Sequence, residues 1–332
     1  MKATATSFTD DVSPKEKSVA ALFFELIKAR LTLLVVLTTL VGFYLGAPAP
    51  VDLVLMVNAI LGTALVASGA AALNQVLERE FDARMRRTAD RPLPSGRVSV
   101  NSALLLGVVL SVAGLAWLLL LVNPLTAMLG AATHACYVFV YTPLKRVTVL
   151  NTLVGAIPGA LPPLMGWTGA TNELSAPGWS LFGLLFFWQL PHFMAIAWLY
   201  RDDYAGAGFK MLSGGDPQGQ RTASSAIRNS FALLVVSLFP YLFGLAGYWY
   251  LAGAIAGGFV FLLMAFRFGR HLTHATARAL FLTSIAYLPL MLGILVADKN
   301  TKKLTKPAPV PVISPALSPR VVPLFLADRT LI

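Results

Sequence analysis

Long apolar runs separated by short polar segments dominate this 332-residue sequence, and they restrict the folds open to it. The runs cover roughly residues 20–45, 53–76, 103–121, 125–141, 148–167, 179–200, 231–248, 252–268 and 279–297. Most are close to the ~20 residues that cross the hydrocarbon layer of a membrane as a helix. Backbone groups cannot stay unpaired in lipid, and the alternation typical of an outer-membrane barrel is absent. The pattern predicts an all-α polytopic membrane bundle of about nine transmembrane helices.

The composition excludes an ordinary soluble domain. Hydrophobic residues make up 57% of the chain and charged residues only 12%, about half the usual charged share. The formal net charge of +11 would suit nucleic acid in a soluble protein. Here basic loops held on the cytoplasmic side of a membrane explain the charge, so we expect a lipid bilayer and no nucleic acid as partner.

The distribution of lysine and arginine predicts the orientation of the bundle. The loops after the second, fourth, sixth and eighth runs are basic, whereas those after the first, third, fifth and seventh hold no lysine or arginine. Residues 1–19 show no signal peptide and little likeness to a mitochondrial presequence. We therefore expect a bacterial inner (plasma) membrane, a cytoplasmic N-terminus and an active site at the cytoplasmic face.

The chain divides into three parts. Residues 1–19 form a polar cytoplasmic segment, and residues 20–297 form one transmembrane domain. Residues 298–332 are rich in proline and lysine and are predicted to be a disordered tail.

An acidic face closes the second apolar run. Asn74, Glu78 and Asp82 are spaced by four, so a helix carries them on one face. Such oxygen ligands suit Mg²⁺, which completes its shell with water and substrate phosphates. The alternative is an ordinary water-facing helix end, in which Glu78 pairs with Arg79 or Asp82 pairs with Arg86.

An arginine-rich loop with prolines and glycine follows, and it includes Arg87 and Arg91. Because prolines and glycine interrupt any helix here, a shaped loop can fold its arginines over the membrane mouth. The planar fork of arginine matches phosphate oxygens. Retention of positive charge in the cytoplasm is the competing explanation.

Two further polar clusters close even-numbered runs and are expected at the same membrane face. The first, after the fourth run, comprises Tyr141, Lys145 and Arg146, whose cations suit a phosphate or a helix cap. The second follows the sixth run and comprises Tyr200, Arg201, Asp202, Asp203 and Lys210, with His192 about two turns deeper. Its two acids could hold metal and diphosphate together with Asp82. His192 could touch substrate or ligate an iron porphyrin, or be a hydrogen-bonded bundle histidine.

These motifs together resemble the UbiA-type intramembrane prenyltransferases. The first signature is Asn74-x₃-Glu78-x₃-Asp82, followed by Arg87-Thr-x-x-Arg91-Pro-Leu-Pro-Ser-Gly-Arg97. Glu78, where other branches generally have Asp, and the segments 141–146, 162–167 and 191–204 resemble the haem-modifying branch. The similarity covers residues 20–297. Tyr200 departs from it, because it stands near where many relatives have an acid.

The resemblance implies a nine-helix bundle with a central cavity open to lipid. It implies transfer of a farnesyl group from farnesyl diphosphate to a vinyl group of haem B, with water added, and a Mg²⁺ requirement. Asn74, Glu78, Asp82, Asp202 and Asp203 would be catalytic and would hold metal. The phosphates and substrates would be bound by Arg87, Arg91, Lys145, Arg146, Tyr141, His192, Tyr200, Arg201 and Lys210.

Two other functions remain open from the sequence. A UbiA-type enzyme could instead prenylate an aromatic acceptor such as a quinone precursor. A transporter would also carry polar residues within the membrane, although usually near its midplane. Haem A synthase is a candidate partner.

Overall fold

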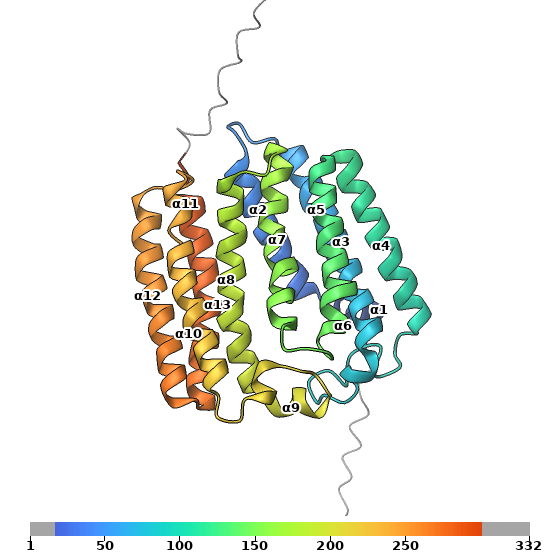
Figure 1. The fold of residues 1–332 in the computed structure, drawn as a ribbon. Coiled ribbons are helices and arrows are strands. Elements are labelled where there is room, and N and C mark those ends of the chain that lie inside the picture. Colours follow the sequence, from blue (N-terminus) through green and yellow to red (C-terminus); the bar gives the residue numbers. More distant parts are fainter. Residues whose placement is uncertain (1–16, 301–332) are drawn as a thin grey trace, which may run out of the picture.

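The computed structural model describes residues 17–300 as a bundle of roughly parallel helices (Figure 1). Its long helices are α2 (Ala29–Gly46), α3 (Leu53–Asp82), α4 (Val100–Leu121), α5 (Pro124–Ala135), α7 (Asn151–Thr171), α8 (Ala176–Leu199), α10 (Gln220–Val236), α12 (Tyr248–His271) and α13 (His274–Ala297). Short elements are α1 (Val19–Leu26), a π-helical turn (Cys136–Tyr141), α6 (Thr142–Leu144), α9 (Arg201–Gly206), a 3₁₀ turn (Leu212–Gly215) and α11 (Phe239–Leu242).

The helices form two halves joined through the centre. On one side α3 packs on α4 and α5, and on the other α10, α12 and α13 pack together (Figure 1). Between them α2 packs on α7, and α7 on α8. The connections at one end, which include α1, α9 and the segment after α3, are longer than those at the other (Figure 1).

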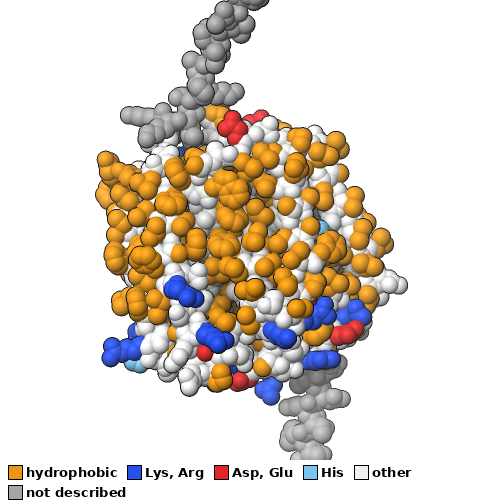
Figure 2. All heavy atoms as spheres, in the orientation of Figure 1, with side chains coloured by type: hydrophobic (Ala, Val, Ile, Leu, Met, Phe, Trp, Pro, Cys, Tyr) orange, Lys and Arg blue, Asp and Glu red, His pale blue; other side chains and the backbone are white. Residues whose placement is uncertain are grey.

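The surface agrees with a bundle that spans a membrane. Eight helical segments of the described part are long and apolar enough to cross a bilayer. Hydrophobic side chains cover most of the visible face, and lysine and arginine gather toward the end that carries α9 (Figure 2). The predicted all-helical membrane fold is confirmed.

The remaining long helix, α7, does not reach the same mean hydropathy, because Pro158, Pro162 and Pro163 and several glycines interrupt its apolar sequence. It is the most enclosed part of the bundle. A Cβ atom on Gly42 of α2 would lie 1.9 Å from the Pro163 carbonyl oxygen, so the two helices approach to backbone contact.

The first apolar run is not one helix, as predicted, but two. The chain breaks at Lys28, which has a left-handed φ of 50°. The side chain of Gln75 stabilises this break, because its Nε2 donates to the carbonyl oxygens of Glu25 (3.0 Å) and Leu26 (2.8 Å). The break turns Lys28 toward α3 instead of leaving it on the helix surface.

The predicted start of the seventh run at residue 231 is also wrong. Helix α10 begins at Gln220, because a face of small and hydroxyl residues (Thr222, Ala223, Ala226 and Ser230) packs in the bundle interior. Arg221 and Arg228, expected in a loop, therefore lie exposed on this helix.

The two ends of the predicted domain lie close to the boundaries of the described residues. Helix α1 begins at Val19, and α13 ends at Ala297. Asp298 accepts a hydrogen bond from the Tyr250 backbone (2.8 Å), and Lys299 donates to the Ala47 carbonyl oxygen (2.9 Å). Residues 1–16 of the predicted cytoplasmic segment and residues 301–332 of the predicted disordered tail lie outside the described residues. Asp298 and Lys299, which were predicted to belong to that tail, make the contacts just given.

Candidate active site

Three polar side chains line up on the inner face of α3 near its C-terminal end. Asn74, Glu78 and Asp82 are only 0%, 5% and 1% exposed. Their spacing of four residues places them on one face of the helix, over about 12 Å at a rise of about 1.5 Å per residue. An apolar helix buries such groups only if each of them finds a partner.

Each of the three has a lysine or arginine partner from another part of the chain. Lys28 Nζ lies 2.5 Å from Asn74 Oδ1, and Lys145 Nζ lies 2.7 Å from Glu78 Oε1. Arg91 Nη1 lies 2.6 Å from Asp82 Oδ2.

The alternative of an ordinary helix end, with local pairs to Arg79 and Arg86, is therefore wrong. Arg79 pairs with the exposed Glu80 at 2.9 Å, and Arg86 forms no ion pair within residues 17–300. The inward-facing row is held by tertiary contacts.

The turn after α5 brings Lys145 to this row. Because Pro143 has no backbone N–H, the α-helical ladder cannot continue through it, and the preceding turn is π-helical. Thr142 Oγ1 donates to the Tyr137 carbonyl oxygen (2.8 Å) and accepts from Asn74 Nδ2 (2.9 Å). One hydroxyl thus joins the π turn to the acidic row.

The arginine loop after α3 contacts the region of α9. Arg87 donates to the Tyr204 hydroxyl at 2.8 Å, and its guanidinium lies 4.8 Å from that ring centroid and 5.5 Å from the Tyr200 centroid. Phe81 of α3 packs against Phe209 at 5.6 Å between centroids. The clusters after α3 and after α8 therefore meet at one end of the bundle, as predicted.

The acids of α9 are not drawn into the buried row. The side chain of Asp202 is 98% exposed, and its nearest cation is Arg201 at 3.7 Å. Asp203 is half-buried and forms no ion pair within the described residues. No three His, Cys, Asp or Glu side chains of residues 17–300 are grouped to hold a metal ion. The two acidic sets share an end of the bundle but do not form one closed ligand shell.

The remaining predicted residues take different positions. Arg146 is exposed and lies over the Phe81 ring at 4.8 Å, and Arg201 lies over Trp198 at 4.7 Å. The side chain of Lys210 is exposed, while its backbone N–H donates to the Lys145 carbonyl oxygen at 2.7 Å.

His192 lies apart from the acidic row. Its Nδ1 is 2.6 Å from the Ser284 hydroxyl of α13, on the other side of the bundle. The structure therefore does not bring it to the predicted diphosphate site.

A cavity of about 240 Å³ lies inside the bundle. It is lined mostly by apolar and small side chains of α2, α3, α5, α7 and α8. Tyr141 connects the cavity with the acidic row, because its ring lines the cavity and lies 4.5 Å from Lys145 Nζ. Thr63, at the far end, is eleven residues from Asn74 along α3, which is about 16 Å at a rise of about 1.5 Å per residue.

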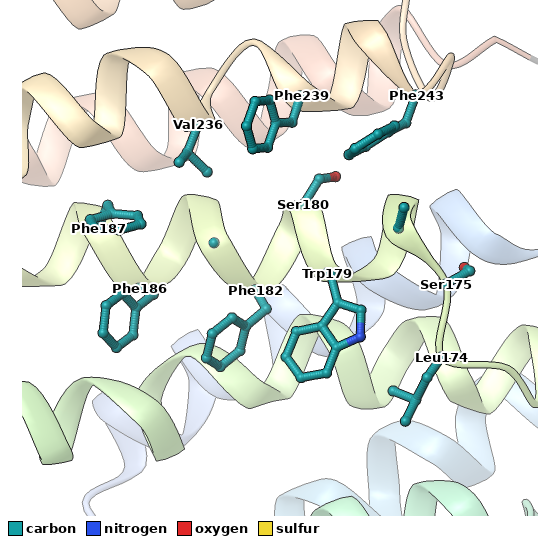
Figure 3. A pocket seen from close by; sticks show the side chains of 12 residues that line it. Leu174, Ser175, Trp179, Ser180, Phe182, Phe186, Phe187, Val236, Phe239 and Phe243 are labelled. Carbon is teal, nitrogen blue, oxygen red and sulfur yellow. The ribbon is translucent and has the colours of Figure 1, made fainter.

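A second hollow lies on the outer surface between α8 and the α10–α11 segment (Figure 3). Aromatic side chains of α8, among them Phe182 and Phe186, line it together with Phe239 and Phe243 (Figure 3). No charged side chain lines it. It therefore lacks the groups needed to bind a diphosphate.

Lys145, Arg87 and Arg91 supply the positive charge at the mouth of the cavity, whereas burial lowers the pKa of Lys28 to about 7. Burial by itself would lower the pKa of Lys145, but Tyr141 and the Glu78 carboxylate raise that pKa above its ordinary value. Lys145 therefore stays an ammonium ion over the physiological pH range. Arginine is charged at any such pH, so Arg87 and Arg91 add two permanent charges beside it.

The donor set fits a hard divalent cation bound with a polyphosphate. Asn74, Glu78 and Asp82 offer only oxygen ligands toward the shared face, which suits Mg²⁺. Glu78 Oε2 and Asp82 Oδ1 have no hydrogen-bond or ion-pair partner within the part of the chain described. A phosphate oxygen would be met by Lys28, Lys145 and Arg91, which already point at this face.

Lys28 and Thr142 contact the acidic row directly, although neither was predicted to be part of it. Lys28 is separated from Asn74 by 46 positions, and only the helix break at Ile27–Lys28 turns it inward. A cation inside an otherwise apolar run was the one available signal. No sequence signal singles out the hydroxyl of Thr142.

Comparisons with known proteins agree with this architecture. Residues 35–288 match the UbiA prenyltransferase family. A protein of Solibacter usitatus (strain Ellin6076) named protoheme IX farnesyltransferase is 46% identical over 286 residues, which cover 83% of this chain and 98% of that protein. A protein of Opitutus terrae with the same name is 48% identical over 278 residues, covering 83% and 94%.

The fold is shared with a solved structure of a UbiA homologue from Archaeoglobus fulgidus bound to GPP and Mg²⁺. The TM-score is 0.62 and the identity 16%, over 82% of this chain and 99% of that one. A match over most of the sequence to one family model, together with relatives that are covered over 94–98% of their length, leaves one assignment. This chain belongs to the UbiA prenyltransferase family.

Proposed function

We propose that this protein transfers a farnesyl group from farnesyl diphosphate to a vinyl group of haem B, with addition of water, to give haem O and pyrophosphate. The observation that carries this proposal is the 46–48% identity to proteins named protoheme IX farnesyltransferase over 83% of the chain. It is supported by a cation-rich, oxygen-lined mouth that opens into a narrow apolar cavity.

The cations at the mouth stabilise the leaving group. When the allylic C–O bond breaks, negative charge grows on the diphosphate, and Lys28, Lys145 and Arg91 lie where they can neutralise it. Mg²⁺ bound at Asn74, Glu78 and Asp82 would supply further Lewis-acid stabilisation of the phosphate oxygens. Arg87 is held by Tyr204 and would contact the diphosphate from the loop side.

The cavity protects the reactive carbon skeleton. A farnesyl cation reacts with water at once unless its surroundings are dry. The 240 Å³ cavity is lined mainly by apolar groups and lies directly behind Tyr141, so an isoprenoid chain would extend into it from a diphosphate at the mouth. The Tyr141 ring would face the carbon at which the bond breaks.

The two acids of α9 complete the proposed site only when substrate is bound. Asp202 and Asp203 lie on α9 beside Tyr200, which packs under Arg87. A bridging metal–diphosphate would give Asp203 the cation that it lacks within residues 17–300, and would give Asp202 a second one besides Arg201. Arg146, Arg201 and Lys210 would add positive charge around the entrance.

We also propose where the protein lies in the cell. The basic end of the bundle faces the cytoplasm of a bacterial inner membrane, the N-terminus lies on that side, and farnesyl diphosphate reaches the site from there. Haem B enters from the bilayer. Haem A synthase, which would use the product, is the proposed partner.

Purified protein in detergent, supplied with haem B, farnesyl diphosphate and Mg²⁺, tests the reaction directly. Chromatography of the extracted haems is expected to show haem O, and pyrophosphate is expected to be released in equal amount. Removal of Mg²⁺ with a chelator is expected to stop both. Prenylation of an aromatic quinone precursor in place of haem, or transport without pyrophosphate release, would overturn the proposal.

A further inference from the structure

His192 has the geometry of a preorganised metal ligand, although it lies away from the acidic row. It is on α8, seven residues before Leu199 at the basic end. Its neighbour Phe193 lines the central cavity. His192 itself points toward α13, about 10 Å from the end of α8 at a rise of about 1.5 Å per residue.

The hydrogen bonds around Ser284 fix the position of the imidazole proton. Ser284 Oγ lies 2.6 Å from the Phe281 carbonyl oxygen and 2.6 Å from His192 Nδ1. A hydroxyl has one proton, and the carbonyl can only accept. Ser284 therefore donates to Phe281 and accepts from Nδ1–H. This leaves the lone pair of a neutral imidazole on Nε2.

The ring orientation is fixed as well. The imidazole stacks between Trp188 at 5.2 Å (23° between planes) and Phe281 at 5.1 Å (30°). Trp188 is itself held by a 2.8 Å hydrogen bond from Nε1 to the Ser284 carbonyl oxygen. Two aromatic walls and one hydrogen bond leave the imidazole a single direction in which to present Nε2.

That lone pair is free. Within residues 17–300, His192 makes no other hydrogen bond, and Nε2 is not among the fully enclosed polar atoms that lack a partner. A histidine whose Nδ1–H is held by an oxygen acceptor and whose Nε2 is open is the arrangement found at metal ligands.

The surroundings select the kind of metal. His192 belongs to no group of three His, Cys, Asp or Glu side chains within the described residues. A bare Zn²⁺ ion needs about three or four protein ligands, so one histidine does not hold it. An iron porphyrin brings four nitrogen ligands of its own and needs one axial histidine.

We propose that His192 binds the iron of the haem acceptor through Nε2, with Ser284 fixing the tautomer and with Trp188 and Phe281 fixing the ring. This inference rests on the proposed function, because that function makes haem the acceptor. Axial ligation would set the porphyrin plane across the Nε2 edge of the imidazole.

Titration of the full-length protein in detergent with iron protoporphyrin IX and with metal-free protoporphyrin IX tests this assignment. Resonance Raman spectroscopy of the ferrous complex is expected to show an iron–histidine band. His192→Ala is expected to remove the band and to weaken iron porphyrin binding at least tenfold. Binding of the metal-free porphyrin is expected to stay unchanged, which shows that the variant is folded.

Three further variants sharpen the result. His134→Ala is the matched control, because His134 is a buried histidine of α5, and it is expected to keep the band. Ser284→Ala keeps the ligand but loses its hydrogen bond, so iron porphyrin affinity is expected to fall about tenfold while the band shifts but persists. Imidazole added to His192→Gly is expected to restore the band.

The inference is overturned if His192→Ala retains the band and the wild-type affinity for iron porphyrin, or if His134→Ala loses the band. Farnesyl transfer assayed on the same preparations distinguishes failure of the proposed function from failure of the inference about His192. An intact iron–histidine band without haem O formation would count against the proposed function alone. Haem O formation by a wild-type protein that shows no iron–histidine band would count against the inference alone.

Discussion

Individual side chains in the buried row of α3 are held by ion pairs and charge-assisted hydrogen bonds. Substitution of one of them is therefore expected to have a larger effect than substitution of an exposed neighbour. Glu78 is paired with Lys145 in the interior, with only 7% and 17% of the two side chains exposed. Glu80, two positions later, is 68% exposed and pairs only with Arg79. A surface pair of that kind contributes little, whereas breaking a buried pair leaves an uncompensated charge.

Glu78→Gln is expected to lower kcat for farnesyl transfer by about a hundredfold or more, because it removes a charged ligand from the site where the leaving group is stabilised. Glu80→Gln changes the same functional group on the same helix, outside the row, and is expected to retain wild-type kcat. Steady-state haem O formation by the two purified variants measures the difference. Equal activities in the two would contradict the site assignment.

Lys28→Met is expected to raise the KM for farnesyl diphosphate by about tenfold to a hundredfold, the usual loss for one charge-assisted hydrogen bond. Arg30→Met removes an exposed cation two residues later and serves as its control. Initial rates at varied farnesyl diphosphate concentration give the two KM values. A larger effect of Arg30→Met would show that Lys28 is not at the phosphate end of the site.

At the scale of helices, glycine sets the width of the cavity. A Cβ atom on Gly155 of α7 would lie 2.4 Å from Cε2 of Tyr141, so the ring that joins the acidic row to the cavity fits only because this position has no side chain. A Cβ atom on Gly293 of α13 would have no such neighbour within 4 Å. The two positions therefore separate the effect of crowding from the effect of glycine replacement itself.

Gly155→Ala is expected to destabilise the protein by about 1–3 kcal/mol through overpacking and to lower haem O formation, because Tyr141 must move. Gly293→Ala is expected to leave the Tm and the activity unchanged. Thermal unfolding in detergent and the haem assay on both variants measure these effects. Wild-type behaviour of Gly155→Ala would mean that the Tyr141 ring is not fixed where the structure places it.

The same scale shows what sequence reasoning could and could not reach. The four-residue spacing of Asn74, Glu78 and Asp82 predicted one helix face, because a helix repeats on that period. The partner cations were only partly predictable. Lys28 reaches Asn74 across 46 positions through a helix break that the apolar pattern of residues 20–45 conceals. The side-chain directions of Asp202 and Asp203 depend on α9, which is too short to show periodicity.

For the whole molecule, charge and hydropathy together predict how the bundle sits in the membrane. The helical, membrane-spanning character was predictable, since lipid requires helices of this length, although eight described segments qualify as spans against about nine predicted. Which helices pack against each other was not predictable. Helix α7 is central because its backbone approaches that of its neighbours closely, and hydropathy does not express such packing.

Single cysteines test the proposed orientation. In a Cys136→Ala background, Gly214→Cys marks the basic end and Glu173→Cys the opposite end, and both positions are exposed. A membrane-impermeant thiol reagent is expected to label Glu173→Cys in spheroplasts and Gly214→Cys only after the membrane is opened, because basic loops stay in the cytoplasm. The reverse labelling pattern would place the active site outside.

The central claim is that this bundle makes haem O through the buried row on α3. The most direct measurement is haem extraction and chromatography from cells that lack any other haem O source and express the wild-type chain, Glu78→Gln or neither. Haem O is expected with the wild-type chain and absent, or nearly so, with Glu78→Gln and in cells without the gene, while both proteins accumulate in the membrane at equal levels. Unchanged haem B with no haem O in the wild-type cells would contradict the account.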